Sequence, residues 1–260
     1  MSVTGGSSYI LRVILVLSVL LLTAGGGTGG EAGLLAEIEA LYHEMDLEGT
    51  LDRKVFRLAV IGFANLRDRG ELKKVTPLSI IDYTKPSTEK RLVVVDIPGR
   101  RLLRTSLVAH GKNTGENYAV RFSDEPGSLM SSFGFFATGE TYYGKHNYSL
   151  RLHGLEKEFN DNALERFVII HGAWYVSQEF ISRHGRLGRS WGCPALPLET
   201  TNEIIDLIKG GSCLFVYFND QAYLENSIFL DEKRATEWFT ANGGLYGTGK
   251  SQKSKQKTGG

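Results

Sequence analysis

Apolar residues in the first third of the chain recur at helical spacing. In the stretch LLAEIEALYHEM, residues 34–45, apolar side chains follow one another at steps of three and four positions. The stretch LDRKVFRLAVIGFANLRDRG repeats this period and ends at Gly70, and glycine is common just beyond the last turn of a helix. The pattern predicts a helical N-terminal segment over residues 31–75.

Beyond Thr76 and Pro77 the chain changes to short runs rich in β-branched residues. These runs predict strands at residues 78–83, 91–97, 101–110, 134–142, 148–155, 166–172 and 213–218. Pro98 and Gly99 suit the two central positions of a type II turn, so the segments on either side of them are predicted to form a hairpin.

Helical spacing returns twice between the last two predicted strands. The stretches are VSQEFISRHG and LETTNEIIDLIKGG, and each is predicted to be a helix. Many short strands with few crossover helices indicate a mainly β fold, an antiparallel sandwich or barrel-like domain over residues 76–240.

The N-terminus carries the pattern of a secretory signal peptide. Arg12 precedes the run VILVLSVLLL, and the small residues TAGGGTGG follow it. This apolar run is shorter than a membrane span, so we expect a signal peptide over residues 1–24 and an exported protein in the periplasm or cell envelope. An uncleaved signal anchor is the alternative.

The C-terminus lacks apolar periodicity. Residues 242–260 read NGGLYGTGKSQKSKQKTGG, a composition that predicts a disordered basic tail over residues 241–260. Its lysines are expected to be solvated, and a weak contact with the wall or a membrane surface is the second interpretation.

Composition removes one class of function. The chain has 260 residues, of which 42% are hydrophobic and 23% charged, ordinary values for a globular protein. The net charge of +1 gives no field that favours nucleic acid, and no nucleic-acid-reading motif is visible. We therefore exclude nucleic acid as a partner.

A scarce thiol lies in an unusual loop, GRLGRSWGCPALP, residues 185–197. Acyl transfer by Cys193 needs a nearby base, and His171 follows an apolar strand at a position that a short helix and a return loop could bring near. The Gly172 carbonyl could fix the tautomer of that imidazole. Gly192 would let a substrate approach the backbone, and amides of the loop could stabilise an oxyanion.

Other residues near the thiol suggest further roles. Arg186 and Arg189 suit a substrate that bears carboxylates, because guanidinium binds them bidentately. His184 is closer to Cys193 in sequence than His171 is, but it lies at the end of a predicted helix, where histidine commonly meets the last carbonyls. We therefore prefer His171 as the base.

The second cysteine leaves two alternatives open. In an exported protein, Cys213 could form a disulfide with Cys193. The alternation of CLFVYF instead favours a buried free thiol at Cys213. His146 and His153, in a turn and a strand, are expected to be structural, and no spacing of cysteine and histidine indicates a metal site.

The segments IIHGAWYV and GRLGRSWGCPALP together resemble the L,D-transpeptidases of bacterial peptidoglycan, the YkuD-type cysteine enzymes, and most of all the murein L,D-transpeptidase catalytic domain family. The likeness extends through SLVAHGKNTGENY, GETYYGKHNYSLRLHGLE and FNDNALERFVIIHG, about residues 76–218. The family's His-Gly and Ser-x-Gly-Cys match His171, Gly172, Ser190, Gly192 and Cys193. Trp191 stands where the best-known members have histidine, and Pro194 and Ala195 also depart from the family pattern.

The resemblance implies a function. Cys193 would attack the carbonyl of the third residue of a peptidoglycan stem tetrapeptide, and an amine of another stem would resolve the acyl-enzyme without metal or cofactor. It also brings His110 near the cleft, with a structural role as the alternative, and adds Ser190, Trp191 and Gly192 to the arginines as candidate substrate contacts. An L,D-carboxypeptidase, with water as acceptor, and a non-catalytic peptidoglycan-binding protein are the other hypotheses.

Overall fold

A computed structural model describes residues 28–247. Eight strands and six helices are present in this range. The strands are β1 (Leu78–Asp82), β2 (Leu92–Asp96), β3 (Arg101–Ser106), β4 (Gly134–Gly144), β5 (Asn147–Gly154), β6 (Ile169–Gly172), β7 (Ala195–Leu196) and β8 (Cys213–Tyr217). The helices are α1 (Thr28–Glu44), α2 (Arg53–Arg69), α3 (Gln178–His184), α4 (Leu198–Ile208), α5 (Gln221–Asn226) and α6 (Glu232–Asn242).

The strands form one mixed sheet in the order β3-β2-β1-β8-β4-β5-β6-β7. The pairs β1–β8 and β6–β7 are parallel, and all the other neighbouring strands are antiparallel. Just beyond β3, Ala109 bridges Ala195 of β7, so the two edges of the sheet approach each other and the barrel nearly closes. The predicted mainly β fold behind a helical segment is confirmed.

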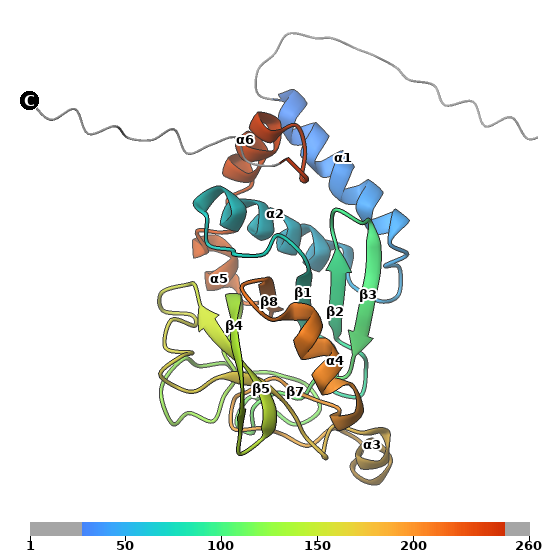
Figure 1. The fold of residues 1–260 in the computed structure, drawn as a ribbon, viewed down its shortest axis with the longest axis vertical. Coiled ribbons are helices and arrows are strands. Elements are labelled where there is room, and N and C mark those ends of the chain that lie inside the picture. Colours follow the sequence, from blue (N-terminus) through green and yellow to red (C-terminus); the bar gives the residue numbers. More distant parts are fainter. Residues whose placement is uncertain (1–27, 248–260) are drawn as a thin grey trace, which may run out of the picture.

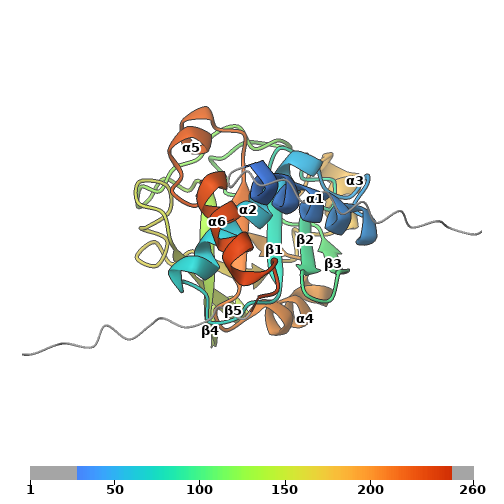
Figure 2. The same ribbon diagram turned by 90° about the horizontal axis from the view of Figure 1, so that it is seen from above.

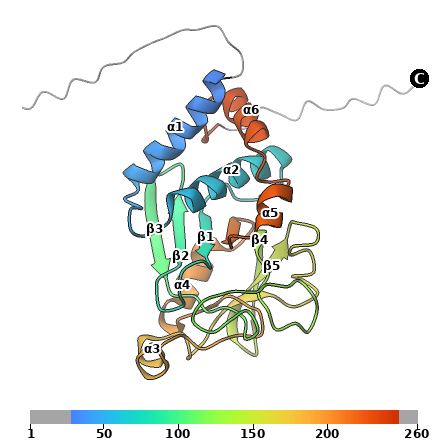
Figure 3. The ribbon, with the colours of Figure 1, turned by 180° about the vertical axis from the view of Figure 1, so that it is seen from behind.

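Helices α1, α2 and α6 gather at one end of the molecule, with α3 at the opposite end (Figure 1). Seen from above, the three lie over the sheet (Figure 2), and from behind, β1, β2 and β3 run side by side beneath α1 and α2 (Figure 3). Helix α2 begins at the N-cap Asp52 and ends at Gly70, whose φ of 73° is left-handed, as expected for this glycine. It contacts β1 and β8, and a β-carbon on Gly62 would overlap the Phe135 ring of β4.

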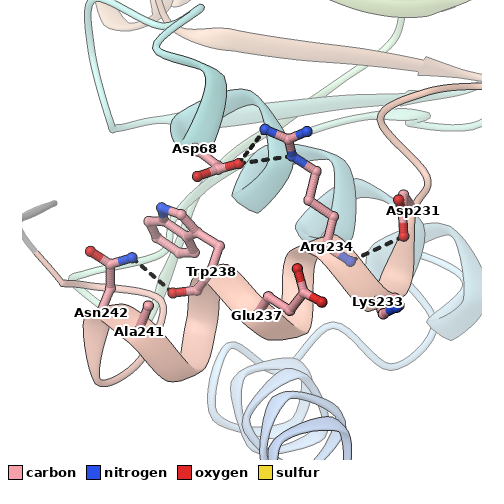
Figure 4. A pocket seen from close by; sticks show the side chains of 8 residues that line it. All are labelled: Asp68, Asp231, Lys233, Arg234, Glu237, Trp238, Ala241 and Asn242. Carbon is pink, nitrogen blue, oxygen red and sulfur yellow. Dashed lines mark hydrogen bonds and ion pairs between the residues drawn. The ribbon is translucent and has the colours of Figure 1, made fainter. Parts of the chain in front are cut away.

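Helix α6 is held against α2 by polar contacts (Figure 4). The Arg234 guanidinium donates to Asp68 of α2 at 2.8 Å, and the Asp231 carboxylate caps α6 by accepting from the Arg234 amide. Arg67 of α2 lies over the Trp238 ring, 4.8 Å from its centroid. The C-terminal helix is thereby part of the same folded unit as the N-terminal helices.

Two sequence predictions differ from the structure in detail. The β2–β3 hairpin forms, but its turn is not type II: φ is positive at Arg100 (50°) and not at Gly99, while the Arg100 amide donates to the Ile97 carbonyl. A left-handed residue directly after the turn adapts it to the twist of the two strands. The tail was expected from residue 241, whereas Leu245 is fully buried and its carbonyl accepts from Arg67.

The expected signal peptide lies outside the described residues, as does most of the expected basic tail. Within residues 28–247, no helix combines the length and the apolar character that crossing a bilayer requires.

Candidate active site

The cysteine segment follows α3 and is fixed along one side by backbone hydrogen bonds. The Ser190 amide donates to the His110 carbonyl at 3.0 Å, and the Lys112 amide donates to the Ser190 carbonyl at 2.8 Å. Further along, the Ala109 amide donates to the carbonyl of Ala195 at 2.8 Å. Backbone hydrogen bonds therefore hold the chain both before Cys193, at Ser190, and after it, at Ala195.

The Ser190 hydroxyl forms hydrogen bonds within this loop. Its hydroxyl donates to the Cys193 carbonyl at 2.6 Å and accepts from the Gly192 amide at 3.1 Å. The Ser131 hydroxyl also donates to the Gly192 carbonyl at 2.9 Å. With Ser190 95% buried and both functions of its hydroxyl used, its side chain braces the turn rather than reaching into solvent.

Glycine at position 192 is required by the backbone. Its φ of 129° is a conformation that other residues rarely adopt, and an added β-carbon would lie 2.7 Å from the Met130 carbonyl oxygen. The Gly192 amide is already engaged with Ser190. Pro194 has no N–H, and within residues 28–247 the Cys193 amide donates to no oxygen acceptor but faces its own thiol, whose pKa it lowers. This leaves the Cys193 amide available to an oxygen of a bound molecule.

His171 is held by β6. Its Nδ1 lies 3.0 Å from the Gly172 carbonyl oxygen, which can only accept, so Nδ1 carries the proton and Nε2 is free to act as a base. In the parallel pair β6–β7, His171 is opposite Ala195, two positions after Cys193. The expected contact between the His171 imidazole and the Gly172 carbonyl is present, and the strand register brings the histidine beside the cysteine segment.

Cys193 and His171 line one pocket of about 530 Å³. The other lining residues are Tyr142, Lys145, His146, Arg166, Phe167, Ile169, Tyr175, Arg189, Ser190 and Trp191. The Cys193 Sγ lies 3.7 Å from the Phe167 carbonyl oxygen. Phe167 has a left-handed φ of 55° and an exposed ring, an unusual conformation for an aromatic residue that lies at the mouth of the pocket.

Burial favours the neutral forms of both groups. It lowers the pKa of His171, against the hydrogen bond with Gly172, and His146 lowers it further. Burial also raises the pKa of the Cys193 thiol, opposed by a backbone hydrogen bond from Ile169 and by the positive charge of Arg166. At rest the pocket therefore holds a thiol and a neutral imidazole.

Sequence reasoning missed seven of the twelve residues that line the pocket, and two of these seven, His146 and Arg166, affect the pKa values of His171 and Cys193. His146, expected to be structural, lies at the tip of the β4–β5 hairpin with its ring centroid 4.3 Å from that of His171. Arg166, 5% exposed, donates to the Met130 carbonyl at 2.6 Å and pairs with Asp124 at 3.0 Å. Both residues lie in segments that carry the family resemblance, and this resemblance was the only sequence signal for them. Periodicity could not place them, because the sheet register and the loop packing bring them to the pocket.

The two arginines of the loop share one partner. Arg186 contacts one oxygen of the Glu116 carboxylate at 2.8 Å, and Arg189 contacts the other at 2.6 Å. Of the two, only Arg189 lines the pocket of Cys193. The ring of Trp191 is 76% exposed at the same pocket, with the Lys145 ammonium 5.9 Å from its centroid.

His110 and His184 lie elsewhere. His110 is buried, with Nδ1 2.8 Å from the Arg91 guanidinium and Nε2 3.2 Å from the Gly115 carbonyl, and burial lowers its pKa to about 3. The structure therefore does not bring its side chain to the pocket, although its carbonyl supports Ser190. His184 ends α3, with its ring tilted against that of Phe180 and 4.2 Å between the two centroids, and it does not line the pocket either.

Comparison with known proteins gave a family match. Residues 47–217 match the family model described as the L,D-transpeptidase catalytic domain, which takes in α2 as well as the sheet. No curated protein sequence matches the chain.

Several solved structures match part of the chain, with low identities and low TM-scores. An L,D-transpeptidase from Mycobacterium smegmatis is 14% identical with a TM-score of 0.34, and the match covers 55% of this chain and 58% of that one. One from Xylanimonas cellulosilytica is 13% identical with a TM-score of 0.34, over 71% and 93%. The helical cell shape determining protein Pgp2 from Campylobacter jejuni is 13% identical with a TM-score of 0.34, over 56% and 48%.

Proposed function

Because this chain belongs to the L,D-transpeptidase catalytic domain family, we propose that it is an exported peptidoglycan L,D-transpeptidase with Cys193 as nucleophile and His171 as base. One observation carries the assignment of roles. Both side chains line the same pocket, and Nδ1 of the imidazole is tied to the Gly172 carbonyl so that Nε2 can take a proton. The substrate class follows from the family, which acts on peptidoglycan stem peptides.

The first half-reaction forms the acyl-enzyme. Cys193 Sγ attacks the carbonyl carbon of the third stem residue while its proton passes to His171 Nε2. The negative oxygen of the tetrahedral intermediate accepts a hydrogen bond from the Cys193 amide. The imidazolium then protonates the amine of the terminal residue, the C–N bond breaks, and a thioester remains on Sγ.

The second half-reaction returns the thiol. An amine of a second stem attacks the thioester carbonyl and gives its proton to His171, the C–S bond breaks, and the thiolate takes that proton back. A new amide joins the two stems. If water attacks the thioester instead, the C–S bond breaks and the trimmed stem leaves with a new terminal carboxylate, which is the L,D-carboxypeptidase outcome.

Several pocket residues have proposed supporting roles. Arg166 places a positive charge that favours the thiolate during attack, as its effect on the Cys193 pKa indicates. Trp191 presents an exposed ring for the substrate to pack against, and Arg189 presents a cation at the same pocket. Ser190 and Gly192 act through the shape of the turn.

The test is incubation of the purified mature protein with defined tetrapeptide muropeptides, followed by mass spectrometry of the products. Crosslinked dimers that require Cys193 would support transpeptidation, and Cys193→Ala is the matched control. Tripeptides alone would replace the proposal with carboxypeptidase activity. Unchanged muropeptides that co-sediment with the protein would replace it with a binding role.

A further inference from the structure

We propose that Arg186 and Arg189 form a carboxylate-binding subsite that Glu116 fills in the free protein and that a carboxylate of the substrate peptide takes over. This inference rests on the proposed function for its substrate and adds a specificity-determining residue, Glu116, to it.

The geometry is that of a bound carboxylate. Arg186 Nε lies 2.8 Å from Glu116 Oε2, and Arg189 Nη1 lies 2.6 Å from Glu116 Oε1. One planar carboxylate thus bridges two guanidinium groups, each at the distance of a charge-assisted hydrogen bond. Any carboxylate that reached this position would find the same two donors.

The two arginines are fixed independently of Glu116. Arg186 donates to the Leu187 carbonyl at 2.8 Å, and Arg189 donates to the carbonyls of Lys112 and Gly115 at 3.2 and 3.1 Å. Their side chains are only 25% and 19% exposed. The donors would therefore keep their positions if the carboxylate left.

Displacement of the Glu116 carboxylate from the arginines, in contrast, costs little free energy. Its side chain is 69% exposed, and within residues 28–247 the arginines are its only polar partners. The loop that carries it is held by its neighbour Asn117, whose backbone and side-chain oxygens accept from the Ser87 amide and hydroxyl. A change of side-chain rotamer is sufficient to open the subsite, because the backbone does not need to move.

The position suits a substrate of the thiol. Arg189 lines the pocket of Cys193 and also a neighbouring pocket of about 700 Å³, which Glu116 and Tyr118 line as well. Arg189 thus stands between the reacting centre and a second hollow with room for more of the peptide, and Arg186 meets it at the Glu116 carboxylate. Exchange of one carboxylate for another leaves the charge balance of the arginines unchanged, so the expected cost to the enzyme is small.

Two carboxylates of a stem peptide have the required chemistry: the terminal one, and any side-chain carboxylate of the third residue. Three peptides separate them, one with both groups free, one with the terminus amidated, and one with the side chain amidated. The variants are Glu116→Gln, which removes the competing charge, and Glu179→Gln, which removes an exposed ion pair with Arg183 that lies outside both pockets.

Affinity is measured by calorimetry in the Cys193→Ala background, and KM is measured in the active enzyme. Glu116→Gln should tighten binding of the free peptide about two- to fivefold, the range that exposed ion pairs span. The substitution should leave unchanged the affinity for the peptide in which the carboxylate that binds to the arginines has been amidated. Glu179→Gln should change none of them.

Equal effects of Glu116→Gln on all three peptides, no effect, or weaker binding of all of them would overturn the subsite and leave the ion pair as a brace of the loop. The calorimetric arm also separates the two proposals. A selective gain in affinity without turnover would retain the subsite and reject the transpeptidase, whereas turnover without selectivity would do the reverse.

Discussion

The two cysteines of this chain lie in regions that make opposite use of the same side chain. Cys213 is in β8, fully buried in the sheet core, and burial raises the pKa of its thiol far above the ordinary value. Cys193 is partly exposed in a pocket with His171, a backbone hydrogen bond from Ile169 and the charge of Arg166. Both thiols are free, so the expected buried thiol at Cys213 is confirmed over the disulfide.

The groups around a thiol determine how reactive it is. A cysteine without a base, a cation or an amide at hand behaves as a small apolar residue. The strand supplies Cys213 with packing alone, whereas the loop and β6 bring Cys193 into one pocket with the His171 imidazole. Four substitutions test whether the two thiols differ in reactivity as their surroundings predict.

The largest effect is expected from Cys193→Ala. Removal of the nucleophile should lower the rate of stem-peptide cleavage by about 10⁴-fold or more, since no other group forms the covalent bond. Intact-protein mass spectrometry should show an acyl adduct on the parent protein and none on the variant. An adduct that persists on Cys193→Ala would mean that the two thiols had been assigned to the wrong roles.

His171→Ala should come second. Without the base, acylation should slow by roughly 100- to 10,000-fold, measured by stopped-flow under single-turnover conditions. His184→Ala is the control, because this histidine is at the exposed end of α3 and away from the pocket. A slow His184 variant beside a near-normal His171 variant would reverse the assignment of the base.

The pH dependence of acylation follows from the lowered pKa of His171. The base must be neutral, and a pKa below the ordinary value of about 6.5 means that protonation begins only at more acidic pH. The midpoint of the acid limb of the acylation rate should therefore lie below pH 6.5.

Removal of the neighbouring imidazole provides the control for this profile. His146→Phe keeps an aromatic ring against His171 but removes the electrostatic effect by which His146 lowers the pKa of His171, so the acid limb should move to higher pH. An unchanged limb, or one centred at 6.5 in the parent protein, would show that the pocket does not tune the base.

The smallest effect should come from Cys213→Ala. Activity should be retained, and the free energy of unfolding in denaturant should fall by about 1 kcal/mol, because a small buried group is lost. In the native parent protein, a soluble alkylating reagent should label Cys193 alone and reach Cys213 only after unfolding. Fast native labelling of Cys213 would contradict its burial.

The sequence by itself determined what depends on near neighbours in the chain. Apolar spacing and a C-terminal glycine predicted α2, and β-branched runs predicted all strands of the sheet except the two-residue β7. The cysteine segment and His-Gly pointed to Cys193 and His171 as the reacting pair. The Gly172 carbonyl was also expected to fix the tautomer of the His171 imidazole, because the two residues are adjacent in the chain.

Only the tertiary structure decided which distant residues meet. Three contacts join segments that lie far apart in the chain: the bridge from Ala109 to Ala195, the contact between the His146 and His171 rings, and the shared contact of Glu116 with Arg186 and Arg189. Periodicity reports which face of a strand is buried, but not which strand or loop lies beside it. The arginines were therefore predictable as carboxylate binders, whereas the presence of an internal carboxylate between them depended on strand order and loop packing.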